Sequence, residues 1–385
     1  MQFLSWARYG LFMLWLGWPL WAAAMPPLVV GLNADMSAAD REAGEAIRHG
    51  AQTAIDEINA AGGVLGRPLA LEVHDHRRNP ARGVANVEAL AARDEVVAIL
   101  GGKHTPVILA ELETIHAHAI PYLVPWAAGT SVVDNGYQPN YVFRASVRDE
   151  YAGGFLVDHA LGRGYQRLGL VLEQTGWGRS NEQALTRALA AYDLQPVRIE
   201  WFNWGKRDFS AALERLQAAD VDVLLFVGNV PDGVNFIRAV AALPAPSSLP
   251  VISHWGIVGG DFVEALGPTL ERVDLTFLQT FSFLAPPFPE RAAAVAERAG
   301  PTPAPAGFAH AYDLIHLLAL AIERAGSTER AAVREALTQI DFHPGLVRDY
   351  APPFTTERHD ALDASDFRMA HYVDGVITPL DRNGE

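Results

Sequence analysis

Cysteine is absent from the 385 residues of this chain. The absence excludes disulfides, thiolate nucleophiles, iron–sulfur clusters and a lipid attached to a cysteine at a cleavage site. Half of the residues are hydrophobic, which is enough for a chain of this length to form two domains with their own cores. We therefore expect a protein that is stable through packing alone and is free in its compartment.

Positive charge is scarce. The chain has 30 Lys and Arg residues against 45 Asp and Glu residues, which gives a formal net charge of −15 at neutral pH. An acidic surface repels phosphate backbones and anionic lipid head groups. We expect neither nucleic acid nor a membrane surface among the partners.

The first stretch, "MQFLSWARYGLFMLWLGWPLWAAAM", differs in composition from everything after it. Arg8 is its only charged side chain, and Ala22, Ala23 and Ala24 are the small residues that a signal peptidase needs. The apolar core between them is too short to span a bilayer comfortably. We predict a cleaved signal peptide over 1–24 and a periplasmic mature protein; an uncleaved membrane anchor is the alternative.

Several catalytic fingerprints are missing. "GLNADMSAADREAG" follows the first expected strand but lacks the G-x-G-x-x-G of a dinucleotide site. "GGKHT" at 101–105 has neither the spacing nor the Lys-Ser/Thr pair of a phosphate-binding loop. "WGRSNE" lacks the second glycine of a G-x-S-x-G elbow. No catalytic group is identified, and we expect a protein that is not an enzyme.

Two histidine pairs are candidate metal ligands. His74 and His76 lie on an expected strand, whereas His116 and His118 lie on an expected helix, where a spacing of two points the rings roughly 200° apart. Neither pair has a partner at metal-binding spacing. We interpret them as solvated or hydrogen-bonded surface histidines, and expect no metal and no cofactor.

Expected strands and helices alternate along the whole mature chain. "VVAIL" is a short continuous apolar run, typical of a strand covered on both faces, and "PVILAELETIHAHA" is a helix with Pro106 in its first turn. Gly62-Gly63 ends an earlier helix, and Asp374-Gly375 turns a final hairpin. A second α/β series begins near Arg148. The pattern predicts two similar α/β lobes, with a ligand cleft beyond the carboxyl ends of the strands.

The order of these elements resembles the leucine/isoleucine/valine-binding protein family. The resemblance covers nearly the whole mature chain, from "GLNADMS" through "AIDEINAAGGVLGRPL" and "IPYLVPWAAGT" to "YVFRAS". These are type I periplasmic solute-binding proteins of ABC importers. The resemblance implies an α/β two-lobed fold in which each lobe is a parallel sheet flanked by helices, with three hinge crossings. It places the first lobe at 26–146 plus 279–340 and the second at 147–278 plus 341–385.

The resemblance also assigns a ligand site. His104 and Thr105 match the loop that binds a ligand carboxylate, Thr105 also being a candidate helix cap, and the carbonyl of Ala127 matches the acceptor of a ligand ammonium. Trp177 matches the aromatic residue that closes over the ligand. The full predicted set is His104, Thr105, Trp126, Ala127, Ala128, Tyr151, Trp177, Asn229 and Trp255.

Two of these positions depart from the family pattern. Ala128 stands in place of a threonine, and Trp255 stands where amino-acid binders often carry a glutamate. Glu173 is a candidate for the missing negative charge or an exposed carboxylate, His254 lies beside Trp255, and Trp204 is assigned to packing. The prediction is a monomeric periplasmic component of an ABC importer that closes over an amino acid or related solute, aromatic acids included. A sensory receptor of the same fold and a secreted enzyme using His104 with Glu173 remain alternatives.

Overall fold

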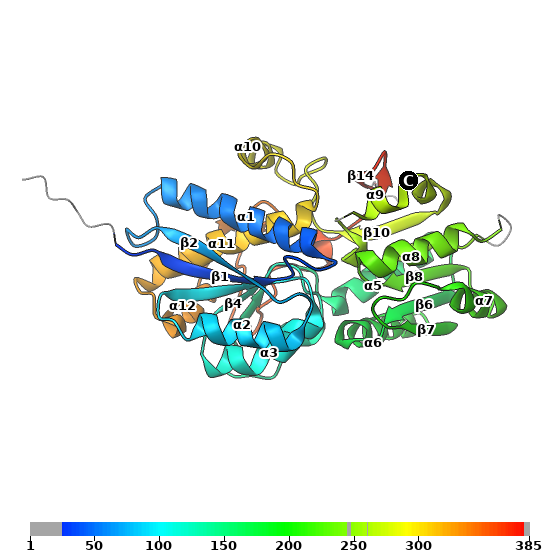
Figure 1. The fold of residues 1–385 in the computed structure, drawn as a ribbon, viewed down its shortest axis with the longest axis horizontal. Coiled ribbons are helices and arrows are strands. Elements are labelled where there is room, and N and C mark those ends of the chain that lie inside the picture. The colour runs from blue at the N-terminus through cyan, green and yellow to red at the C-terminus, as the bar shows by residue number, and fades with distance from the viewer. Residues whose placement is uncertain (1–24, 245–247, 260, 381–385) are drawn as a thin grey trace, which may run out of the picture.

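The protein, described here as a computed structural model covering 25–244, 248–259 and 261–380, has two α/β lobes side by side (Figure 1). Each lobe contains one largely parallel sheet flanked by helices, which confirms the predicted fold class. The expected signal peptide over 1–24 lies outside the described residues.

The first lobe has a five-stranded parallel sheet in the order β2-β1-β3-β4-β5. Every residue of β1 and β3 is buried, as expected for strands with helices on both sides. Its strands are β1 (Leu28–Ala34), β2 (Leu69–Asp75), β3 (Val96–Gly101), β4 (Tyr122–Val124) and β5 (Val142–Arg144). Its helices are α1 (Arg41–Ala60), α2 (Pro80–Ala91), α3 (Thr105–Ala117), α4 (Thr130–Val133), α10 (Pro289–Ala299), α11 (Pro305–Ala325) and α12 (Arg330–Leu337).

The second lobe has a seven-stranded sheet in the order β14-β13-β10-β9-β8-β6-β7. Its strands are β6 (Leu168–Glu173), β7 (Arg198–Phe202), β8 (Val223–Val227), β9 (Val251–Ser253), β10 (Leu275–Gln279), β13 (Arg368–Val373) and β14 (Val376–Pro379). Its helices are α5 (Asp149–Gly162), α6 (Gly176–Ala190), α7 (Ser210–Ala218), α8 (Val230–Ala241), α9 (Phe262–Leu266), η2 (Trp255–Ile257), η3 (Gly267–Arg272) and η4 (Ala364–Asp366). The predicted hairpin is confirmed, since β13 and β14 pair antiparallel around Asp374 and Gly375, both with positive φ.

Helix α11 is the central helix of the first lobe. By length and composition alone it could cross a membrane, yet 89% of its most apolar stretch is buried inside the protein. It packs along α1 and α12 (Figure 1). The helix is therefore accounted for as part of the first lobe's core.

The chain passes between the lobes after β5 and again after β10. The short strands β11 (His343–Pro344) and β12 (Asp349–Tyr350) then follow α12. The chain on either side of β12 still contacts the first lobe. The backbone N–H of Leu346 donates to Asp313 of α11, and Asp360 forms a bridge with Arg144 of β5. The lobe limits remain a prediction, but these contacts favour a third crossing after Asp360 instead of between 340 and 341.

Candidate functional site

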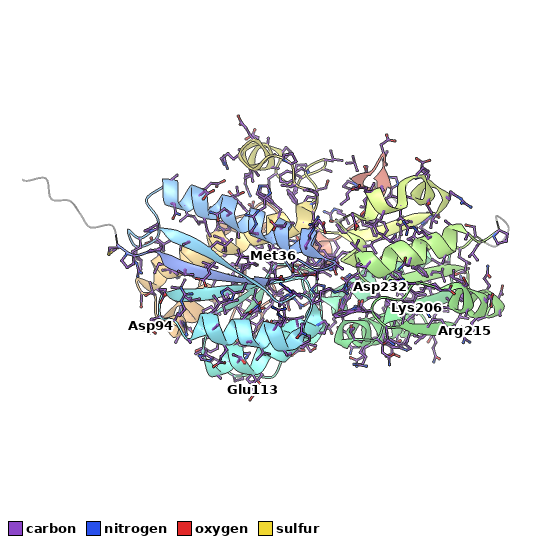
Figure 2. All side chains as sticks on the ribbon, in the orientation of Figure 1. Met36, Asp94, Glu113, Lys206, Arg215 and Asp232 are labelled. Atoms are coloured by element: carbon purple, nitrogen blue, oxygen red, sulfur yellow. The ribbon has the colours of Figure 1, made fainter. Side chains whose placement is uncertain are left out.

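The candidate site lies between the lobes, where loops that follow the strands of one sheet meet loops that follow the strands of the other. Lys103 Nζ donates to the carbonyl of Gly256 across the lobes at 2.9 Å. The rings of Trp126 and Trp255, one from each lobe, lie 5.5 Å apart between centroids. Figure 2 labels Asp232 in the second lobe, near the junction with the first. The lobes are therefore closed on one another.

Asp40, just before α1, contacts three side chains of the first lobe: Lys103, His104 and Arg78. Its Oδ1 accepts from Lys103 Nζ at 3.1 Å, and its Oδ2 lies 3.1 Å from His104 Nε2 and 3.4 Å from Arg78 Nη1. Burial raises the pKa of Asp40, but the charge of Lys103 and the hydrogen bond from His104 outweigh it and hold the pKa well below its usual range. Asp40 is thus an ionised carboxylate inside the closed site.

His104 is neutral in this setting. Burial lowers its pKa more than the hydrogen bond to Asp40 raises it. Because Asp40 can only accept, the proton of the neutral ring lies on Nε2, and Nδ1 is left as an acceptor. Nδ1 is buried and has no hydrogen-bond partner among the described residues.

The loop after β4 carries the Trp126 indole, and the backbone carbonyls of this loop already accept hydrogen bonds from the protein. Lys103 Nζ lies 5.3 Å from the centre of that ring, and a Cβ on Gly307 would come within 2.2 Å of its benzene edge. Trp126 Nε1 is buried without a partner in the described chain. The carbonyls accept as follows: Trp126 O from Ser146 Oγ at 2.7 Å, Ala127 O from Arg144 Nη1 at 3.3 Å, and Ala128 O from the N–H of Asp149 at 2.9 Å.

Glu173, at the end of β6, organises one side of the second lobe's surface. Its Oε1 accepts from Thr175 at 2.6 Å, and its Oε2 accepts from Trp204 Nε1 at 2.9 Å and Asn229 Nδ2 at 3.0 Å. Burial raises the pKa of Glu173 to about 7. The carboxyl group holds the Trp204 indole in place and is fully buried, so it is not the exposed carboxylate of the alternative reading.

Asp149, at the start of α5, organises the other side. Its Oδ1 accepts from Trp177 Nε1 at 3.1 Å and lies 3.1 Å from His254 Nε2, which is too poorly aligned for a hydrogen bond. His254 Nδ1 accepts from the N–H of Trp255 at 2.9 Å. Asp149 Oδ2 is buried and has no partner within the described ranges.

Both lobes therefore bring unpaired polar atoms to their junction. Buried polar groups are normally hydrogen-bonded, and leaving one unpaired costs about 1–3 kcal/mol. A concentration of such atoms between two lobes is the signature of a site whose partners come from a bound molecule. The unpaired donors are Arg78 Nε, Arg78 Nη2 and Trp126 Nε1, and the unpaired acceptors are His104 Nδ1, Asp149 Oδ2 and Asp232 Oδ2.

Most of the predicted residues converge on this junction. His104 and Trp126 lie on the first-lobe side, Trp177 and Trp255 on the second-lobe side, and Asn229 binds Glu173 behind them. Ala127 and Ala128 are buried in the loop after β4. The roles of these residues toward a ligand remain predictions.

Thr105 and Tyr151 differ from the rest. Thr105 Oγ1 accepts from the N–H of Gly129 at 3.1 Å, which ties two first-lobe loops together. The helix cap is His104, so the alternative that Thr105 merely caps the helix is wrong. Tyr151 lies apart from the others, half-buried under the guanidinium of Arg148 and beside Tyr137 in a separate hollow on the hinge side.

Sequence reasoning missed other residues of the junction. Trp204, which was assigned to packing, does pack, but at the junction: its ring lies under Arg78 at 4.3 Å and 5.9 Å from His104. The available signal was position alone, since each missed residue follows a strand by a few positions, as sheet-edge ligand sites require. The missed residues are Asp40, Arg78, Lys103, Asp149 and Trp204.

The histidine pairs do not form a metal site. His74 pairs with Glu72 and His118 with Glu88, whereas His76 is buried 5.8 Å from the His104 ring, so its interpretation as a surface residue is wrong. A different group, Asp35, Asp40 and His104, brings potential ligand atoms within 4.8 Å of one another. Two fixed cations, Lys103 and Arg78, already occupy that carboxylate, and a metal ion would be repelled by both.

Comparison with known proteins places the chain in a family. A family model described as periplasmic binding protein matches 27–374, and the chain belongs to that family. Leu/Ile/Val-binding protein BraC3 of Rhizobium johnstonii is 27% identical over 80% of this chain and 83% of its own. The solved LivJ substrate-binding protein of Streptococcus pneumoniae, in complex with isoleucine, has a TM-score of 0.79 at 20% identity over 92% of this chain and 99% of its own. A solute-binding protein of R. palustris in complex with benzoate has a TM-score of 0.78 at 18% identity, over 93% and 96%.

Proposed function

We propose that this protein is the periplasmic component of an ABC importer and binds one small organic solute between its lobes. The solute is an amino acid or a related compound, aromatic acids included, and the protein acts as a monomer without catalysis. Membership in the periplasmic binding protein family supports the class of protein. The observation that carries the proposal is the set of unpaired buried polar atoms contributed by both lobes at one junction.

The mechanism is closure of the lobes over the solute. Two hydrogen bonds join the lobes, from Lys103 Nζ to the carbonyl of Gly256 and from the N–H of Thr130 to Ser180 Oγ, and separating the lobes would break both. A solute that pairs with atoms of both lobes stabilises this form over the open one, because only the closed form satisfies all of them. The permease then recognises the closed shape.

The two alternatives are not favoured by the contacts. For the enzyme, His104 donates to Asp40 and Glu173 accepts from Thr175, Trp204 and Asn229, so each group has its own partners. No contact between His104 and Glu173 is found in the described residues. A sensory receptor would close over its solute in the same way. It would differ only in that its closed form docks on a kinase instead of a permease.

The test is a thermal-shift screen of mature protein that has been unfolded and refolded to remove bound solute. The panel contains branched and aromatic amino acids, aromatic acids, amides and quaternary amines. A solute at a hundred times its dissociation constant adds about 2.7 kcal/mol to the free energy of unfolding, so a rise in melting temperature is expected for at least one compound. No rise with any compound, and no solute released on unfolding, would contradict the proposal.

A further inference from the structure

The Arg78 guanidinium stands at the junction with one edge free. Its Nη1 lies 3.4 Å from Asp40 Oδ2, which fixes one end of the group. Its Nε and Nη2 are both buried, and neither has a hydrogen-bond partner in the described ranges. The side chain as a whole is only 12% exposed, so water does not readily replace the missing acceptors.

The free edge has a definite shape. Nε and Nη2 form the parallel pair of donors with which arginine binds the two oxygens of a carboxylate. Stacking on Trp204 at 4.3 Å fixes the plane of the guanidinium, and Trp204 is itself held by Glu173. The first lobe therefore supplies the donors, and the second lobe supplies the ring on which they lie.

The backbone that carries Arg78 is strained and firmly held. Arg77 and Arg78 both adopt left-handed conformations, with φ of 51° and 57°, a region that non-glycine residues seldom occupy. The N–H of Arg78 donates to His76 Nδ1 at 3.1 Å, and Asn79 caps α2. Strain of this kind persists only when surrounding contacts impose it, and here they fix the backbone from which the Arg78 side chain extends.

Acidic neighbours do not occupy the free edge. Asp232 lies close enough to feel the charge of Arg78, but the two form no ion pair in the part of the chain that the structure describes. Asp232 Oδ1 instead accepts from the backbone N–H groups of Gly205 and Lys206. Both oxygens of Glu173 are taken by side-chain donors of the second lobe, and burial raises the pKa of Glu173 to about 7.

We propose that the Arg78 Nε–Nη2 edge, stacked on Trp204, is the subsite that binds the carboxylate of an organic-acid solute. This inference deepens the proposed function and rests on it. It moves the carboxylate from the predicted position at His104 and Thr105 to a cationic donor pair in a neighbouring loop. At the predicted position His104 Nδ1 is an unpaired acceptor, which cannot donate to a carboxylate, and Thr105 Oγ1 accepts from the N–H of Gly129. Lys103, which donates to Asp40, places a second positive charge on the same side of the junction.

The experiment compares matched acids and amides by calorimetry on refolded mature protein: benzoate with benzamide, and L-leucine with L-leucinamide. We expect the wild type to bind an acid at least about tenfold more tightly than its amide, because an amide cannot accept the bidentate pair with charge. Arg78→Met should weaken the acid about a hundredfold and the amide little. Arg78→Lys, which keeps the charge and loses the paired donors, should weaken the acid about tenfold.

The control is Arg77→Met, which removes the same charge one residue away from a side chain that is 57% exposed and pairs with Asp75. It should bind like the wild type. An acid preference that survives Arg78→Met would overturn the subsite and leave the proposed function standing. An amide bound as tightly as its acid by the wild type would do the same. A wild type that binds no compound of the full screening panel would overturn the proposed function and the subsite with it.

Discussion

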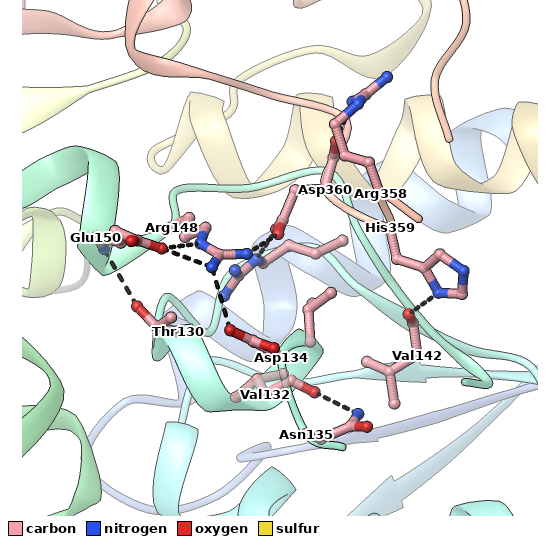
Figure 3. A network of polar contacts seen from close by, with 12 residues as sticks. Thr130, Val132, Asp134, Asn135, Val142, Arg148, Glu150, Arg358, His359 and Asp360 are labelled. Atoms are coloured by element: carbon pink, nitrogen blue, oxygen red, sulfur yellow. Dashed lines mark hydrogen bonds and ion pairs between the residues drawn. The ribbon is translucent and has the colours of Figure 1, made fainter. Parts of the chain in front are cut away.

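Two clusters of charged residues join the lobes, and they differ in how completely their polar atoms are paired. At the hinge, Arg144 and Arg148 both bind Asp360, and Arg148 also binds Glu150 (Figure 3). At the inner junction, Arg78 and Lys103 both bind Asp40, but the paired donors of Arg78 remain free. In each cluster two cationic side chains share one buried aspartate, Asp360 at the hinge and Asp40 at the inner junction.

This difference in pairing assigns the hinge cluster to stability and the inner cluster to solute binding. The hinge network holds together two segments of chain that pass between the lobes, and nearly all of its donors are satisfied by the protein, Arg144 Nη2 being the exception. The inner cluster keeps acceptors and donors unsatisfied on both lobes. Changes at the hinge should therefore reduce stability, whereas changes at the inner cluster should reduce solute affinity.

The largest expected effect is at the hinge. Arg144→Met should lower the free energy of unfolding by about 3–5 kcal/mol, because it leaves Asp360 without its closest buried cation. Urea denaturation measures the change. Arg187→Met is the control, since Arg187 pairs with Glu150 on the surface with its side chain 70% exposed and should cost less than about 1 kcal/mol. Equal effects of the two substitutions would contradict the distinction.

The pH dependence of stability distinguishes buried carboxyl groups inside a lobe from those at the junction. Glu111 lies in the first lobe away from the junction, accepts from Asn33 and Tyr122, and has its pKa raised to about 7 by burial. The folded protein holds this proton at a pH where the unfolded chain has lost it, so stability should fall as pH rises from about 4.5 through about 7. The loss for this group is about 3 kcal/mol, at about 1.4 kcal/mol per unit of pKa.

The measurement is the free energy of unfolding of the wild type and Glu111→Gln across this pH range. The variant should show a flatter dependence while binding solute normally. Glu173→Gln, whose carboxyl has the same raised pKa but holds Trp204 and Asn229, should also alter solute affinity. A change of affinity in Glu111→Gln as large as that in Glu173→Gln would contradict the assignment of Glu173 to the site.

The smallest expected effect is at the rim of the junction. Ser180 Oγ accepts from the N–H of Thr130 across the lobes at 3.1 Å, a bond that requires closure. Ser180→Ala should weaken solute binding about fivefold, near 1 kcal/mol, because the bond stabilises only the closed form. Its melting temperature without solute should match that of the wild type, and calorimetry with the best compound of the screen measures the affinity.

Local pattern and resemblance predicted the fold and several uncharged residues that the structure brings to the junction, but not the charged residues found there. Continuous apolar runs identified β1 and β3, and Asp374-Gly375 identified the last turn. The tryptophans were found because they match positions in known loops. Arg78 and Asp40 could not be found this way, since they come from different loops and meet only through folding.

The partner of Trp204 could not be found for a similar reason. From sequence, an aromatic residue after a strand reads as packing, and only the structure shows that its ring lies under a guanidinium from the other lobe. The carbonyl of Ala127 was predicted to accept a ligand ammonium, and its bond to Arg144 depends on a side chain of a neighbouring strand. Pairing between distant side chains is the information that local patterns lack.

The most direct test of a solute site between the lobes is a crystal structure of the protein with the tightest-binding compound of the screen. We predict the compound between the lobes, with polar atoms within hydrogen-bond distance of at least one currently unpaired atom from each lobe, and its carboxylate on Nε and Nη2 of Arg78. A compound bound elsewhere, with Arg78, Trp126, Asp149 and Asp232 still unpaired or paired with one another, would contradict it.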